Sequence, residues 1–304
     1  MATTAAPRAP SRDPLPASLA LVANAAVWGT CWWPFRQLQA LGVHPLWATA
    51  ITFALAACGI ALLRPRAVAQ LARTPVLWIL VAASGTTNAA FNWAVVIGDV
   101  VRVVLLFYLM PVWTVLLARI LLGERLDARA TLRVGLGLAG AATVLWPTGR
   151  ALAGPALADA LGLVGGFSFA LNNVMLRREA GRPEEARALA MFLGGTLVAG
   201  TIAASLGGAV PAPRLASLEA VGYTLGLTLL FLGGNLALQY GAARLPANRT
   251  AVIMLSEVVF ASASTVLILG DAPSARLVVG GAFIVLAALL AAASPRDVAR
   301  DERR

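Results

Sequence analysis

The chain has 304 residues, of which 59% are hydrophobic and only 12% are charged, and its mean hydropathy is +0.80. Apolar runs of about 20 residues, the length that crosses a bilayer, recur along it and predict a polytopic membrane protein. All 24 basic residues are arginine. The lack of lysine excludes a P-loop ATPase, a Schiff-base enzyme and a Ser–Lys nucleophile pair.

Ten membrane spans are predicted in chain order. The first one is longer than the apolar core of a signal peptide and is followed by further spans, so we expect it to stay in the mature protein. Residues 1–15 and 294–304 lack apolar periodicity and are predicted to be disordered cytoplasmic tails. The predicted spans are 16–35, 45–63, 75–97, 102–122, 131–147, 157–176, 186–206, 219–242, 250–269 and 276–293.

A repeat with a shift of 147 residues is visible within these spans. The segment Asn88-Ala-Ala-Phe-Asn92-Trp93 recurs as Asn235-Leu-Ala-Leu-Gln239-Tyr240, and Gly123-Glu124 recurs as Gly270-Asp271. An internal duplication in an apolar protein indicates transport across a membrane.

Each copy of the repeat holds five spans, in residues 16–147 and 157–293. Because five is odd, the second copy must enter the membrane upside down. The predicted fold class is therefore an all-α polytopic membrane protein, with ten transmembrane helices as two inverted five-helix repeats around a central cavity.

The arginines test this topology independently. With both termini in the cytoplasm, 19 of the 24 arginines fall on the cytoplasmic side, as the positive-inside rule requires. The net charge of +10 thus reflects topology and anionic headgroups, so no nucleic-acid partner is expected. The other side receives Arg36, Arg102, Arg150, Arg214 and Arg276.

The sequence gives little support for a metal site or an enzyme active site. Cys31 and Cys58 both fall in membrane spans, and two cysteines with one histidine do not predict a metal site or another cofactor site. Among the acids only Glu257 lies deep within a span. A membrane enzyme predicts two or more convergent acids or histidines at one depth, and a receptor subunit predicts a large soluble domain; the sequence offers neither.

The ordered motifs resemble those of a known family. Trp28-Gly29 in the first span, Leu-Leu-Gly123-Glu124-Arg at the end of the fourth, and Glu257 followed by Gly270-Asp271 are similar to the drug/metabolite transporter superfamily, EamA-type ten-helix branch. The second Gly-Asp departs from the usual Gly-Glu of this family. The resemblance covers residues 16–293 and implies that spans 1, 3, 4, 6, 8 and 9 surround a cavity while spans 2, 5, 7 and 10 pack outside.

Amide and aromatic side chains fall on the spans that this resemblance places around the cavity. Taken singly, each amide fits helix packing as well as substrate contact, but a set of six on four helices favours a lined cavity. The glycines of spans 5 and 10 predict close helix packing instead. The predicted substrate-binding residues are Asn24, Trp28, Ser84, Asn88, Phe91, Asn92, Tyr108, Asn172, Asn235 and Gln239.

Glu257 is predicted to face the interior, because an acid at this depth costs about 3 kcal/mol on insertion scales. It either holds hydrogen-bond partners or carries a proton for coupled transport. We favour the structural role, because an acid at this place is common in a superfamily whose members use different energy sources.

Within the family, the amides and aromatic residues most resemble those of bacterial aromatic amino-acid exporters. This predicts a facilitative exporter of amino acids, aromatic ones in particular, working by alternating access in the bacterial cytoplasmic (inner) membrane. The alternative is a proton-coupled exporter of drugs or other small metabolites. The predicted partners are a small-molecule substrate and the lipid bilayer; the oligomeric state, monomer or larger, stays open.

Overall fold

The computed structural model describes residues 14–97, 100–124, 128–146, 157–213, 217–270 and 274–292, and these are helical almost throughout. Of the predicted tails, residues 1–13 and 294–304 lie outside the described residues, while Pro14 and Leu15 belong to α1. The elements in chain order are α1 (Pro14–Thr30), α2 (Trp32–Ala40), α3 (Pro45–Leu63), α4 (Pro65–Arg73), α5 (Leu77–Ile97), α6 (Val100–Phe107), α7 (Met110–Leu122), α8 (Ala128–Leu145), α9 (Leu157–Arg178), α10 (Glu184–Ser205), the 3₁₀ turn η1 (Gly207–Ala209), α11 (Leu218–Arg244), α12 (Ala247–Met254), α13 (Ser256–Leu269) and α14 (Ala275–Ala292).

Each predicted span is matched by one or two of these helices, while α4 lies outside the predicted spans. The prediction of an all-helical multi-pass membrane protein is confirmed. Within the described residues, eight helical runs are long and apolar enough to cross a membrane, or nine when the bent pair α4 and α5 is counted. The predicted span that these nine omit is α8, whose first turns carry Arg129 and Arg133.

The duplication extends to the irregular points of the backbone. The fourth span of the first repeat breaks at Tyr108 and Leu109, between α6 and α7, and that of the second breaks at Leu255, between α12 and α13. Each of these spans ends in a left-handed glycine, Gly123 with φ 69° and Gly270 with φ 76°. The break and the glycine both keep the shift of 147 residues, so the two repeats share this helix break as well as their motifs.

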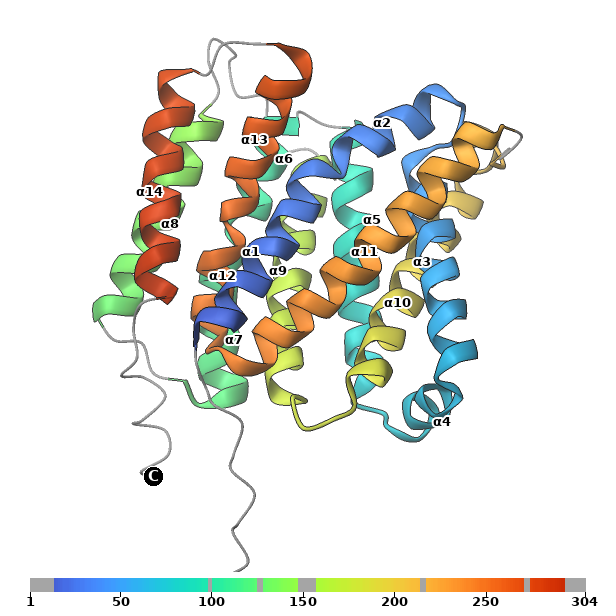
Figure 1. Ribbon diagram of the computed structural model, residues 1–304, viewed down its shortest axis with the longest axis horizontal. Coiled ribbons are helices and arrows are strands. Elements are labelled where there is room, and N and C mark those ends of the chain that lie inside the picture. Colours follow the sequence, from blue (N-terminus) through green and yellow to red (C-terminus); the bar gives the residue numbers. More distant parts are fainter. Residues whose placement is uncertain are drawn as a thin grey trace, which may run out of the picture.

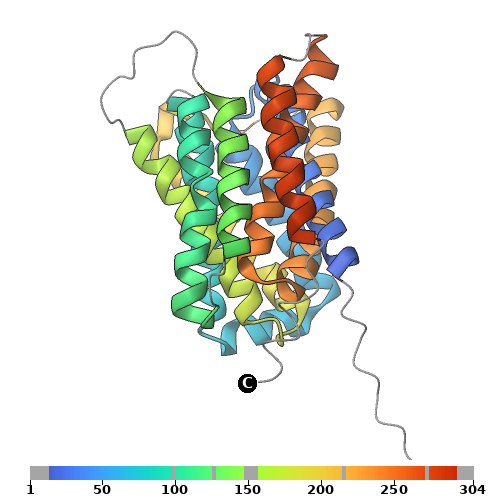
Figure 2. The ribbon, with the colours of Figure 1, turned by 90° about the vertical axis from the view of Figure 1, so that its left-hand side faces the viewer.

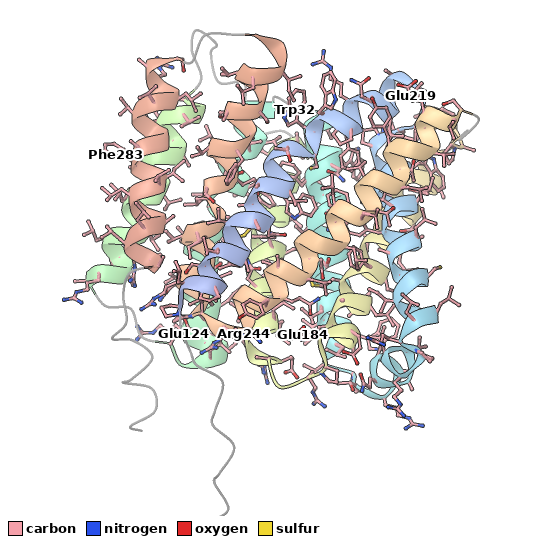
Figure 3. All side chains as sticks on the ribbon, viewed as in Figure 1. Trp32, Glu124, Glu184, Glu219, Arg244 and Phe283 are labelled. Carbon is pink, nitrogen blue, oxygen red and sulfur yellow. The ribbon has the colours of Figure 1, made fainter. Side chains whose placement is uncertain are left out.

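The inverted arrangement brings the predicted cytoplasmic segments to one end of the molecule. In Figure 1 the start of α1, the end of α14, α4 and the link between α9 and α10 lie at the lower end, while α2 and the start of α11 lie at the upper end. Figure 3 labels Glu124, Glu184 and Arg244 at the lower end, and Trp32 and Glu219 at the upper end. This grouping agrees with the arginine distribution; which end faces the cytoplasm stays a prediction.

Glycines bring α8 and α14 into close contact at one edge of the bundle (Figure 2). A Cβ atom added to Gly140 would lie 2.7 Å from the carbonyl oxygen of Gly280, and one added to Gly280 would lie 2.6 Å from that of Gly140. No larger residue fits without separating the helices. The predicted small-residue packing of these two spans is confirmed.

The Gly-Glu motif of the first repeat joins the two repeats at the lower end. The Glu124 carboxylate accepts a hydrogen bond of 3.1 Å from the backbone N–H of Ala247, the first residue of α12. The first N–H groups of a helix lack intrahelical partners and carry the positive end of the helix dipole, so an acid there is stabilising. The motif therefore has a structural task that its sequence spacing alone did not reveal.

Candidate functional site

The described helices enclose a cavity of about 60 Å³ near the middle of the bundle. Among the predicted site residues, nine including Glu257 line it, and Tyr108 and Gln239 do not. The lining residues are Asn24, Trp28, Phe53, Ser84, Thr87, Asn88, Phe91, Asn92, Phe107, Phe169, Asn172, Met191, Phe192, Phe231, Asn235, Leu238 and Glu257.

The polar side of the cavity is formed largely by one face of α5. Ser84, Asn88 and Asn92 follow each other at steps of four residues and share this face. The Asn88 Nδ2 donates to the Ser84 carbonyl at 2.8 Å, and the Asn92 Nδ2 donates to the Thr49 hydroxyl of α3 at 2.7 Å. The Ser84 hydroxyl donates to the Met191 carbonyl at 3.1 Å. An amide nitrogen carries two hydrogens, so these bonds orient both amides and leave each a donor.

Two further amides line the cavity from α1 and α9, the first helices of the two repeats. The fully buried Asn24 donates through Nδ2 to the Met254 sulfur at 3.4 Å, while its Oδ1 has no hydrogen-bond partner. The Oδ1 of Asn172 is also buried without a partner. Buried polar atoms of this kind usually bind water or ligand, so the cavity has acceptor capacity on this side.

The two amide side chains of α11 have different surroundings. Asn235 lines the cavity and donates to the Met191 sulfur at 3.4 Å. Gln239, one turn further, is fully buried away from the cavity. In one orientation of its amide, the Gln239 Nε2 donates to the Asn235 Oδ1 at 2.7 Å. With the amide turned over, the nitrogen donates to the Glu184 carbonyl at 3.1 Å and the oxygen accepts from the Ala188 N–H at 3.3 Å. In this conformation Gln239 connects α11 to the start of α10.

An aromatic cluster closes one side of the cavity. Trp28 stacks on Phe231 with ring centroids 4.8 Å apart, and Phe53 packs edge-on against Phe231 at 5.4 Å and Phe192 at 5.2 Å. Phe53 belongs to α3, and Phe192 and the adjacent lining residue Met191 belong to α10. The expectation that the second and seventh spans pack wholly outside is therefore wrong, because both contribute to the cavity wall. The available sequence signal was an aromatic residue in the middle of each span, Phe53 in the second and Phe192 in the seventh.

A second aromatic cluster forms another part of the cavity wall. Phe107 of α6 lies 4.8 Å from Phe91 of α5 and 5.8 Å from Phe169 of α9, measured between ring centroids. Tyr108 packs edge-on against Phe107 at 5.9 Å. The cavity lining thus combines amides with two groups of rings, a combination that suits a ligand with both polar and aromatic parts.

The two helix breaks meet at Glu257. This residue follows the break of the second repeat as the second residue of α13, lines the cavity, and forms a hydrogen bond with Tyr108 at the break of the first repeat. No ion pair in the described part of the chain involves Glu257. The breaks therefore place an acid and a phenol from different repeats together at mid-depth, where neither side chain is balanced by an arginine.

The family can now be stated from the sequence comparison. Residues 15–146 and 156–293 each match the model of the EamA-like transporter family. The chain belongs to this family. It contains the family domain twice, and the chain is accordingly a multi-pass membrane transporter of small molecules.

A solved structure supports the same fold. A crystal structure, titled only as that of a protein, aligns with this transporter at a TM-score of 0.76 and 22% sequence identity, covering 90% of this chain and 96% of that chain. At this identity the likeness concerns the fold alone. No curated protein matches the chain.

Proposed function

We propose that this transporter is a facilitative exporter of amino acids, aromatic ones in particular, in the bacterial cytoplasmic membrane with both termini in the cytoplasm. Transport proceeds by alternating access between the inverted repeats. The observation that carries the proposal is the cavity composition, in which amides and one acid line the same cavity as two groups of aromatic rings. A zwitterion with a ring side chain matches this combination of groups.

The polar ends of such a substrate find different partners. The remaining N–H groups of Asn88 and Asn92 suit its carboxylate, since both amides share one face of α5. The unpartnered oxygens of Asn24 and Asn172 suit its ammonium. These groups come from both repeats, so a bound substrate would bridge them.

The ring of the substrate would pack on the cluster around Trp28. Apolar surface buried there supplies binding energy at about 25 cal/mol per Å², and ring stacking adds about 0.5–1.5 kcal/mol. The cavity of about 60 Å³ is small against typical ligand pockets of about 300–1,000 Å³, so loading requires these rings to move apart. Binding of substrate in the cavity is therefore coupled to the conformation of the helix bundle.

The lining also disfavours a class of substrate known in the superfamily. Among the described lining residues there is no arginine. A sugar nucleotide carries a diphosphate that proteins usually bind through arginine or lysine. The cavity therefore suits neutral or zwitterionic molecules better than polyanions.

Counterflow in proteoliposomes tests the proposal directly. Vesicles holding the purified transporter and unlabelled phenylalanine should accumulate labelled phenylalanine, tyrosine and tryptophan, while phenethylamine, which lacks the carboxylate, should compete poorly. Exchange of another metabolite class without exchange of any aromatic amino acid would show that the proposed substrate is wrong.

The alternative function is proton-coupled export of drugs or other small metabolites, and the Glu257–Tyr108 contact favours it. An acid in the cavity wall could hold a proton and substrate in turn. Coupling predicts a proton flux in proportion to substrate flux and its loss in Glu257→Gln. Facilitative transport predicts no such flux.

A further inference from the structure

Helix α4 lies across the end of the bundle instead of along it. It meets α5 at an angle of 102°, and its nine residues are far fewer than the roughly 20 that cross a bilayer. Figure 1 shows it at the end where α1 starts and α14 ends. The ends of membrane helices reach the lipid headgroups, so α4 lies at that level.

The side chains of α4 form three faces around its axis. Ala67 and Leu71 are buried, with 0% and 4% of their surface exposed, and attach the helix to the bundle. At 100° per residue, the exposed Val68 lies on one side of this pair. The exposed Arg66 and Arg73 lie together on the other side. An apolar flank and a cationic flank beside an anchored face are typical of a helix in the plane of a membrane interface.

The residues around α4 add positive charge and exposed apolar surface to its two flanks. Between Leu62 and Val76 the chain holds three arginines and no acid. Leu62 and Leu63, at the end of α3 next to α4, are 82% and 77% exposed and extend the apolar surface. The segment therefore combines positive charge with apolar side chains at one boundary of the bundle.

The second repeat shows that the fold does not require this helix. The equivalent link, between α10 and α11, lies at the opposite end of the molecule (Figure 1). Its described residues, 206–213 and 217, hold the short turn η1, and the link contains a single arginine, Arg214. Because the described part of the equivalent link in the second repeat holds η1 and no α-helix, α4 is a feature of one end of the molecule only.

We infer that α4 is a binding site for anionic phospholipid headgroups. Arg66 and Arg73 bind the lipid phosphates, while Val68 inserts beside the acyl chains. Guanidinium groups bind phosphate in a bidentate manner, and each arginine near an anionic surface contributes measurably to attachment. The exposed apolar flank favours a lipid over a soluble phosphate ion.

Lipid binding at α4 acts on the cavity through α5. The link of Thr74, Pro75 and Val76 joins the two helices, and α5 carries the polar cavity face that includes Ser84 and Asn88. A headgroup bound to α4 therefore holds one end of the helix that supplies this face. The inference rests on α4 itself and does not depend on the identity of the substrate.

Lipid quenching of a local probe tests the inference on the full chain. A fluorophore on Val68→Cys, in a background of Cys31→Ala and Cys58→Ala, reports on lipids beside α4. Vesicles of phosphatidylcholine would contain the same small fraction of quencher-labelled phosphatidylglycerol or quencher-labelled phosphatidylcholine. We expect stronger quenching by phosphatidylglycerol, and this preference should fall by roughly five-fold for each arginine replaced in Arg66→Gln and Arg73→Gln.

Controls separate lipid binding from damage to the fold. Arg36→Gln, at the other end of the molecule, should leave the preference unchanged. Raised ionic strength should lower the preference in the protein that keeps both arginines, because screening weakens headgroup attraction without any substitution in α4. Equal quenching by the two lipids before substitution, or a preference that survives both glutamine substitutions and high salt, would overturn the inference.

Discussion

Asn88 and Gln239 form a matched pair that separates substrate contact from helix packing. Both are amides on the central helices of the two repeats, but Asn88 lines the cavity and donates within its own helix, to the Ser84 carbonyl. Gln239 lies outside the cavity, and with its amide turned over it bonds α10 through Glu184 and Ala188. Leucine has a similar size to either amide and removes its polar atoms, so Asn88→Leu should affect transport while Gln239→Leu should affect stability.

The expected magnitudes follow from these contacts. A hydrogen bond to a charged group contributes about 1.5–3 kcal/mol, so Asn88→Leu should reduce transport per folded molecule by about 10- to 100-fold through a higher KM. Its effect on melting should be small, since the lost bond is local. Gln239→Leu removes two bonds between helices, each worth about 0.6 kcal/mol on average in membrane proteins. The resulting loss of about 1 kcal/mol should lower Tm by a few degrees.

Counterflow normalised to folded protein measures the first effect, and melting in detergent together with the size-exclusion profile measures the second. The aromatic amino acid at several concentrations gives KM separately from the maximal rate. If Asn88→Leu remains folded and transports normally, Asn88 does not contact substrate and the assignment of α5 as the polar face fails. If both variants lose stability and transport in proportion, the amides act as helix contacts only.

Three other predictions concern the wall, the acid and the helix contact. Trp28→Ala removes the ring that stacks on Phe231, so KM for tryptophan should rise by about five-fold while KM for alanine stays constant; equal changes for both would contradict the wall assignment. Glu257→Gln preserves a hydrogen-bond partner for Tyr108, so downhill transport should persist with unchanged pH dependence, and a proton flux lost in this variant would favour the coupled alternative. Gly280→Leu places side-chain atoms against the Gly140 carbonyl and should lower Tm more than Gly222→Leu, where no atom lies within 4 Å of an added Cβ; similar melting of the two would refute the packing argument.

The sequence predicts the spans and the repeat well because both depend on properties that do not require packing. Apolar length sets the spans, and the constant shift between Asn88 and Asn235 aligns the repeats. The cavity was harder to predict, because a lining residue depends on helix rotation and tilt as well as on residue type. Phe53 and Phe192 line the cavity but lie on spans without amides. The sequence therefore had no polar helix face in these spans to indicate which side faces the cavity.

Gln239 and α4 illustrate two further limits. The repeat pairs Gln239 with Asn92, but the longer side chain reaches the first turn of α10 instead of the cavity. Sequence equivalence therefore predicts the position of a residue and not the partner that its side chain reaches. The apolar run in α4 is too short to predict a span, so the sequence predicts a cytoplasmic loop between residues 63 and 75. The structure shows a helix there, attached to the bundle by the buried Ala67 and Leu71.

The two breaks give the repeats a chemical asymmetry that the duplication does not predict. At the shift of 147 residues Glu257 corresponds to Met110, and Tyr108 corresponds to Leu255. Each repeat thus supplies one polar group at its break and one apolar group at the equivalent position. Because Tyr108 and Glu257 bond each other, the polar groups meet across the interface of the repeats instead of facing lipid. A movement that separates the repeats at this depth would have to break that bond, so the contact stabilises the arrangement in which the two breaks lie together.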